Sequence, residues 1–205
     1  MTVLNPHRAA FICMLTIVAM FVGTAWSVAS PATSPDHGCT YFPKANSPKS
    51  MGDVLHVEHC ARSDAAGHFH LRHQRLLALD FDRHGLASVN IEGGWYYVRR
   101  NGRLAPVMTM DNGAEPFSEG FARSPVGGKI GFINPNLALV IPARYDGALP
   151  FGDAGAEVCI GCKLVAHGEH SEYEGGRWAC IDQRGHERQP FSSDRGAGKV
   201  CRRDG

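Results

Sequence analysis

The sequence predicts an all-β protein: about three stacked antiparallel β-meander repeats with a period of roughly 35 residues, preceded by an N-terminal cap region. Three segments begin with a glycine pair and continue with a large apolar residue: residues 93–98, 127–133 and 175–181. Their large residues, Trp95, Ile130 and Trp178, are 35 and then 48 residues apart. Such a spacing is typical of repeat architectures, in which each unit buries its apolar face against a neighbour.

The N-terminus has the features of a secretory signal peptide. Residues 1–8 carry one cation and no acid, residues 9–26 carry no charge, and small residues follow at Ser27 and Ala29. We therefore expect residues 1–29 to be removed and the protein to be exported, to the periplasm or outside the cell. The alternative is an inner-membrane anchor through residues 9–26, because eighteen apolar residues can just span a bilayer.

Residues 30–79 are expected to be a linker and cap segment. Residues 33–50 are rich in Ser, Pro, Asn and Lys, which is typical of loops. Five histidines follow within a short span: His56, His59, His68, His70 and His73. Imidazoles suit zinc, copper or nickel, but without a carboxylate or thiolate pattern beside them we favour solvated side chains.

The repeat domain is expected over residues 80–205. Its central unit has strands near residues 121–126 and 130–133, joined by a glycine pair that is typical of a tight hairpin. A second turn at residues 134–136 leads to an apolar third strand. The other units have a glycine in that turn (Gly102 and Gly185) where the central unit has Leu137, so Asn-Pro-Asn must make the turn there.

The large residue of each segment is expected in the core rather than at a ligand, because buried aromatic side chains dominate core energetics. The predicted core set is Trp95, Ile130, Trp178, Phe117 and Phe151. The third unit also carries an insertion, residues 160–173, which explains its longer spacing. Insertions in repeats gather on one face, so we expect this one to belong to a contact surface.

Cysteine usage favours export. Cys13 lies in the signal segment, and six cysteines remain as disulfide candidates: Cys39, Cys60, Cys159, Cys162, Cys180 and Cys201. An even number in an exported chain predicts three disulfide bonds. We favour Cys39 with Cys60 as a local pair and leave the pairing of the other four open.

Two alternatives use the third unit's cysteines. A tetrahedral zinc site would draw on Cys159, Cys162, His167, His170 and Cys180. A thiol oxidoreductase would centre on Cys159 and Cys162. That second alternative is the weaker one, because redox-active pairs of this spacing open a helix, whereas this pair leaves a strand for a polar loop.

Several segments resemble the WG-repeat family of bacterial β-repeat proteins: residues 117–122, 128–133 and 140–148. The resemblance covers roughly residues 80–191. The departures are Ile130 for the family's tryptophan, Tyr96 where a small residue is expected, and Leu137 for a turn glycine. The resemblance implies an all-β binding or interaction module with no catalytic residues to carry over.

Composition and motifs narrow the function further. Without residues 1–29 the chain loses one of its 21 basic residues and none of its 20 acidic ones, so it is neutral and unsuited to nucleic acid. Phosphate-loop, nucleophile-elbow, metalloprotease and dinucleotide motifs are absent from the sequence. We predict a non-enzymatic binding module of the bacterial cell envelope without a cofactor. Its partner is an unidentified protein or envelope ligand, and it contacts membrane only if the signal segment stays.

Overall fold

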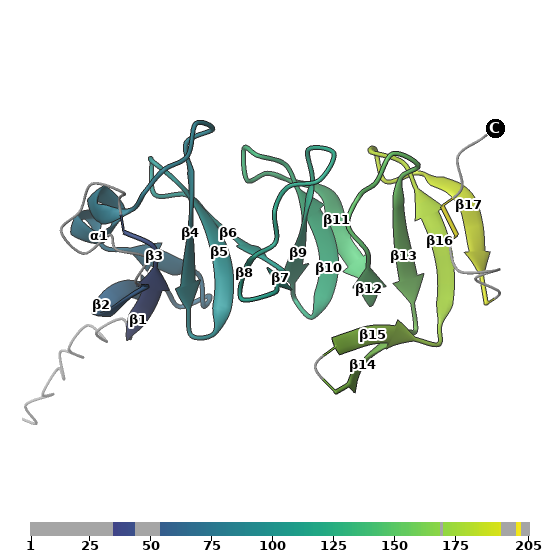
Figure 1. Ribbon diagram of the computed structural model, residues 1–205, viewed down its shortest axis with the longest axis horizontal. Helices are drawn as coiled ribbons and strands as arrows, with labels where there is room; N and C mark the ends of the chain where they lie inside the picture. Colours follow the sequence, from purple (N-terminus) through teal and green to yellow (C-terminus); the bar gives the residue numbers. More distant parts are fainter. Residues whose placement is uncertain (1–34, 44–53, 169, 194–199, 202–205) are drawn as a thin grey trace, which may run out of the picture. The chain divides into compact units, whose positions relative to one another are not determined.

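The computed structural model describes residues 35–43, 54–168, 170–193 and 200–201, all within the compact unit of residues 34–205 (Figure 1). The expected signal peptide, its anchor alternative at residues 9–26 and half of the expected loop at 33–50 lie outside the described residues; the described half of that loop contains a strand, Asp36–Tyr41. Within the described ranges, the helix content is too short and too polar to cross a membrane.

The predicted all-β class is confirmed. The first sheet contains six strands in the order β3-β2-β1-β4-β5-β6. The elements along this part of the chain are β1 (Asp36–Tyr41), β2 (Leu55–Ser63), β3 (Phe69–Leu71), the short helix α1 (His73–Ala78), β4 (Leu86–Ile91), β5 (Gly94–Arg99) and β6 (Leu104–Val107). Because β1 pairs with β4, strands from the expected cap segment and the first meander form one continuous sheet.

The second sheet is the central meander, in the order β11-β10-β9. Its strands are β9 (Ala122–Val126), β10 (Lys129–Ile133) and β11 (Leu139–Tyr145). The glycine pair between β9 and β10 has positive φ angles of 58° and 74°, as a tight hairpin requires. A Cβ atom on Gly131 would lie 2.5 Å from the Ile141 carbonyl oxygen, so only glycine lets β10 and β11 approach this closely.

The third sheet has the order β12-β13-β16-β17. Its strands are β12 (Gly147–Ala148), β13 (Ala156–Ile160), β16 (Arg177–Ile181) and β17 (Glu187–Ser192). The predicted insertion forms a separate hairpin of β14 (Lys163–His167) and β15 (His170–Glu174), which stands out at the ends of β13 and β16 (Figure 1). A second small hairpin contains β7 (Thr109–Met110) and β8 (Gly113–Ala114).

One turn recurs in all three sheets. The side-chain Oδ1 of its first residue accepts hydrogen bonds from the backbone N–H groups two and four residues later, at Asp82 (2.8 and 2.9 Å), Asn134 (3.0 and 3.1 Å) and Asp182 (2.8 Å twice). The fourth residue has a positive φ: Gly85 (73°), Leu137 (58°) and Gly185 (79°). The central turn thus keeps its form without glycine, because Asn134 supplies the side-chain bonds and Leu137 takes up the left-handed conformation.

The large repeat residues lie in the core. Trp95 packs in one cluster with Ile133 and Leu137 of the next meander, and Ile130 packs in another with Val158 of the one after. Trp178 is buried among the cysteines of the third sheet. Phe151 is buried against Phe121 and Phe132, while Phe117 is half-buried beside Tyr97.

Candidate binding groove

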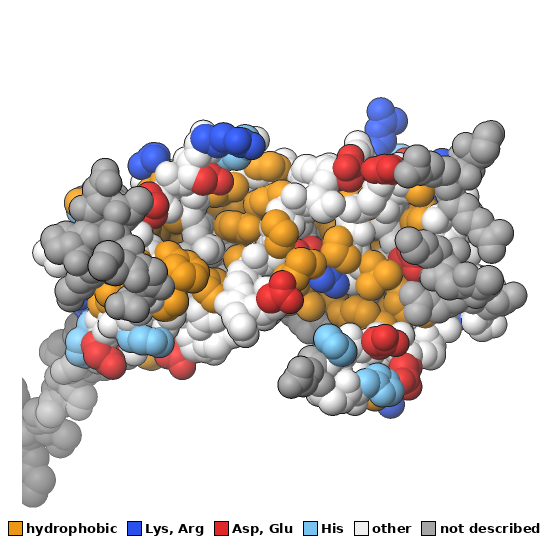
Figure 2. All heavy atoms as spheres, in the orientation of Figure 1, with side chains coloured by type: hydrophobic (Ala, Val, Ile, Leu, Met, Phe, Trp, Pro, Cys, Tyr) orange, Lys and Arg blue, Asp and Glu red, His pale blue; other side chains and the backbone are white. Residues whose placement is uncertain are grey.

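A groove of about 520 Å³ lies beside the β14–β15 hairpin. Its lining is mostly apolar and comes from six stretches of the chain: Met108, Thr109, Met110, Arg123, Leu149, Pro150, Leu164, Ser171, Glu172, Tyr173 and Trp178. Hydrophobic side chains are exposed on the face next to this hairpin, with basic and acidic side chains among them (Figure 2). The insertion therefore forms one wall of a mixed apolar and charged surface.

Two walls of the groove are strand edges. Consecutive residues of a strand point to opposite faces, so a cavity lined by three in a row meets the strand along its edge. This holds for residues 171–173 of β15 and for residues 108–110, which include β7. In the described part of the chain β15 pairs only with β14, and β7 only with β8. The outer edge of β15 is therefore unpaired within the described residues, whereas next to β7 the Met108 N–H already donates to the Arg123 carbonyl oxygen.

The side chain of Arg123 reaches the groove from β9. Its Nε donates a hydrogen bond of 2.7 Å to Glu115 Oε2, and its Nη1 donates one of 2.6 Å to the Ala148 carbonyl oxygen. Its Nη2 makes no hydrogen bond to any described residue. The Arg123 side chain is 10% exposed and that of Glu115 is 1% exposed, so this is a buried ion pair.

Glu115 is the more deeply buried partner of the pair. Burial raises the pKa of its carboxyl group, and the Arg123 guanidinium acts against that rise. The other carboxylate oxygen, Glu115 Oε1, is buried and accepts no hydrogen bond from the described residues. A buried carboxylate with one unsatisfied oxygen is costly, so the ion pair is a buried polar point beside a mostly apolar lining.

The base of the hairpin is fixed by Asp146. Its Oδ2 accepts a hydrogen bond of 2.7 Å from the Gly161 backbone N–H, and its Oδ1 accepts one from Lys129. The Gly161 N–H and then Lys129 lower the pKa of Asp146. At Gly147 a Cβ atom would lie 2.5 Å from the Tyr173 ring, so the absence of a side chain lets the Tyr173 ring pack against the Gly147 backbone. The hairpin wall is therefore held in place from both strands.

The six cysteine candidates form three disulfide bonds, and the favoured pair is present. The pairs are Cys39 with Cys60, Cys159 with Cys162, and Cys180 with Cys201. Both sulfur-bearing residues of the Cys159–Cys162 pair are buried, which places the proposed redox pair away from solvent.

These disulfide bonds contradict the alternative prediction of a zinc site. The bonds use the sulfur atoms of Cys159, Cys162 and Cys180, so the thiolates that zinc requires are not available. His167 Nε2 lies 2.6 Å from Glu174 Oε1 instead, and His170 is exposed. Across the described residues, metal-ligating side chains do not gather in groups of three or more that could hold an ion.

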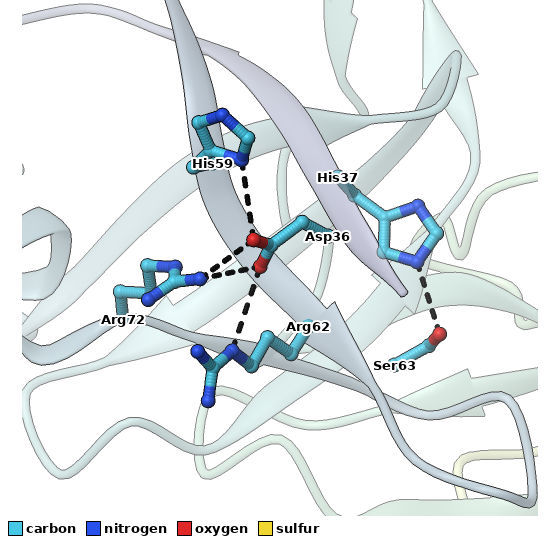
Figure 3. A network of polar contacts seen from close by, with 6 residues as sticks. All are labelled: Asp36, His37, His59, Arg62, Ser63 and Arg72. Carbon is cyan, nitrogen blue, oxygen red and sulfur yellow. Dashed lines mark hydrogen bonds and ion pairs between the residues drawn. The ribbon is translucent and has the colours of Figure 1, made fainter. Parts of the chain in front are cut away.

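Of the five histidines near the N-terminus, His59, His68 and His70 contact carboxylates, and His56 Nδ1 lies 2.9 Å from Thr40 Oγ1; within the described residues they do not gather into a metal site. His59 Nδ1 lies 3.1 Å from Asp36 Oδ2, and Arg72 Nη2 donates to both oxygens of Asp36 at 2.6 and 2.7 Å (Figure 3). Arg72 is the main cause of the lowered pKa of Asp36. His68 and His70 both approach Asp64, whose Oδ1 also accepts two backbone N–H groups.

His37 lies between a serine and a carboxylate, an arrangement that the sequence analysis missed. Its Nε2 is 2.9 Å from Ser63 Oγ (Figure 3), and its Nδ1 is 3.2 Å from Glu92 Oε1. Acyl transfer also requires free N–H donors for an oxyanion, but the Ser63 N–H already donates to the Pro35 carbonyl. The Glu92 side chain is 58% exposed. The Ser63 N–H is therefore not free to bind an oxyanion, and we take the groove as the stronger candidate.

Comparison with known families bears on the middle of the chain. Residues 130–159 match the family model described as a WG containing repeat. This segment is similar to one repeat of the WG-repeat family. It runs from β10 through β11 and β12 to β13, so the resemblance expected from the sequence is confirmed for one repeat. Searches of curated proteins and of solved structures found no match.

The WG repeat contributes directly to the groove. Leu149 and Pro150 of its lining belong to the matched segment, and so does Ala148, whose carbonyl oxygen holds Arg123. The hairpin wall begins only a few residues beyond the match, after the disulfide-bonded Cys159. The groove thus lies at the junction between the segment that matches the family model and the β14–β15 insertion.

Proposed function

We propose that the protein is an exported, non-enzymatic binding module of the bacterial cell envelope, and that the groove beside the β14–β15 hairpin is its contact site. The observation that carries the proposal is the groove's composition: apolar side chains surround a single buried cation, Arg123. Binding sites are typically concave and mostly apolar, with a few fixed polar groups and volumes of about 300–1,000 Å³.

Exposed side chains at the groove support binding. Leu164 is 57% exposed although it is a large apolar residue. Burying such a side chain against a partner contributes about 1.5–3 kcal/mol. Export is supported by the three disulfide bonds, because such bonds persist in oxidising compartments.

The contact site is tested by site-specific photo-crosslinking in the envelope of the producing cell. A photoactivatable residue replaces Leu164 in one sample and Leu139 in the other; Leu139 is also exposed (44%) but lies outside the groove lining. We expect a specific adduct only from position 164. The captured partner is then purified and titrated: Leu164→Asp should weaken its binding about tenfold or more, and Leu139→Asp should not.

Equal adducts from the two positions, or none from position 164, would contradict the groove as the contact site. Export is tested separately by the intact mass of the protein recovered without reductant. A mass that starts near Ser30, with no cysteine open to alkylation, agrees with cleaved export. A mass that retains residues 1–29 would instead support the membrane-anchored alternative.

A further inference from the structure

We infer that the groove takes an extended polypeptide segment, which adds a strand to the outer edge of β15, has apolar side chains at alternate positions and carries one basic residue. This inference rests on the proposed function and names its ligand class. It is argued from the strand edge, the buried arginine and the charge of the groove.

The strand edge favours a peptide over a small apolar molecule. Residues 171–173 line the groove in succession, so their outward backbone N–H and C=O groups face into it. β15 has a partner strand on one side only within the described residues. An extended segment can pair with such an edge through backbone hydrogen bonds, while alternate side chains enter pockets beside it. A small apolar ligand leaves these backbone groups unpaired.

The apolar lining fits the alternate side chains of such a segment. Leu164 and Tyr173 are direct cross-strand partners in the hairpin, so both side chains lie on one face of it. Tyr173 also contacts Trp178 edge to face, with ring centroids 6.3 Å apart. Two or three apolar side chains of an added strand, about 7 Å apart along it, can therefore pack on this face.

The buried arginine selects a neutral hydrogen-bond acceptor. Arg123 is already neutralised by Glu115, so a carboxylate or phosphate ligand would place a second anion beside a buried one. A backbone carbonyl oxygen accepts a hydrogen bond from Arg123 Nη2 without adding charge. Peptide groups supply such oxygens at regular intervals.

The remaining charge selects a cation on the ligand. Arg123 and Glu115 balance each other, which leaves Glu172 as the charged group of the groove lining without an opposite partner in the described part of the chain. Glu172 is exposed and lies on the strand that would receive the ligand. A lysine or arginine of the added strand therefore complements it.

The test uses the oxidised protein and a random heptapeptide display library. Selected peptides should share alternate apolar residues and a Lys or Arg, and their affinity is measured by fluorescence anisotropy. Leu164→Asp should weaken binding about tenfold or more. Glu172→Gln should weaken it about three- to fivefold, with a smaller salt dependence. Leu139→Asp is the matched control and should leave the affinity unchanged.

Backbone pairing is tested with N-methylated versions of the tightest peptide. In a strand, alternate N–H groups point toward and away from the partner, so methylation should abolish binding at every second position only. The β15 amides should also exchange more slowly with solvent in the complex. Equal effects of methylation at all positions, or unchanged exchange in β15, would overturn strand addition.

The outcomes separate this inference from the proposed function. If position 164 captures a partner in the envelope but the library yields no peptide, the groove binds a ligand of another class and the inference fails alone. If position 164 captures nothing and no peptide binds, the proposed function fails as well. Selected peptides without a basic residue would contradict the role given to Glu172.

Discussion

Arg123 joins Glu115 to the backbone of a neighbouring unit through one guanidinium group. Its Nε lies 2.7 Å from Glu115 Oε2, and its Nη1 lies 2.6 Å from the carbonyl oxygen of Ala148 in the short strand β12. The pair thus lies where the central meander meets the third sheet. It has consequences for stability as well as for the groove.

Replacing Arg123 by methionine should destabilise the protein by about 3–5 kcal/mol at pH 7, because it leaves the carboxylate of Glu115 buried without a cation. The loss should be smaller at pH 4, where Glu115 is protonated more easily. Urea unfolding with intact disulfides measures both values. Lys129→Ala removes the cation of the exposed pair with Asp146 and should cost less than about 1 kcal/mol. Similar losses for the two variants would contradict the role of burial.

Acid stability should depend on Asp64. The backbone N–H of His68 and then the His70 side chain lower the pKa of Asp64 from 3.8 to about 2. Between these values the unfolded state binds more protons than the folded state, so the contribution of Asp64 is present above pH 3.8 and is lost as the pH falls toward 2. Asp64→Asn keeps the turn's acceptor oxygen and should flatten the fall in urea midpoint over this range. An unchanged slope would refute the prediction.

At position 137 the glycine variant should be more stable than the alanine variant, the reverse of the usual order of stability. Its side chain is buried, so Leu137→Ala should cost about 2–5 kcal/mol. Because its φ is 58°, Leu137→Gly should be more stable than Leu137→Ala by about 0.5–1 kcal/mol. Leu86 is buried in the same cluster, and its φ is not positive. There the glycine variant should be the less stable one, and the same order at both positions would show that backbone conformation is not the cause.

The disulfide bonds should differ in their contribution to stability. The Cys39–Cys60 bond has a sequence separation of 21 residues and the Cys159–Cys162 bond one of 3. Loop-closure entropy then gives about 3 kcal/mol for the first and less than about 2 kcal/mol for the second. Unfolding of the two double serine variants measures these losses. A larger loss for the short loop would indicate that packing of the buried sulfur atoms outweighs chain entropy.

The repeat features that depend on local chemistry were predictable from the sequence. The glycine pair at residues 127–128 makes the hairpin that it predicts, and Asn134 makes the turn that lacks glycine. Each depends on the conformational preference of one or two residues, which sequence shows directly. The Cys39–Cys60 pair was also predicted, because its partners are close in the chain.

The strands β1 and β2 were not predicted, and for β2 the reason is that it does not alternate regularly. Between the pairs His37 with Ala61 and Cys39 with Val57, β2 contains two more residues than β1. His59 lies in this bulge with a φ of 51°. A bulge shifts the side-chain period, so the polar and apolar positions of residues 55–63 do not form a single pattern.

The groove could not be predicted either. Residues 122–124 of β9 are all buried, including Arg123, because neighbouring units cover both faces of the strand. In the sequence, Arg123 follows an alanine in an alternating strand and is typical of a solvent-facing position. Its burial depends on contacts with Glu115 and Ala148, which only the packed units bring together.

The insertion leaves and re-enters its sheet between paired residues. Ile160 and Arg177 are the last partners of β13 and β16, so the hairpin between them spans a single strand spacing of about 4.8 Å. A hairpin of any length that closes over this distance is compatible with the same strand register. The sequence between Cys162 and Arg177 can therefore vary while the strand register and the three disulfide bonds stay constant, much as exchangeable loops do on other β scaffolds. The groove is then a position at which new specificities can be grafted without redesigning the fold.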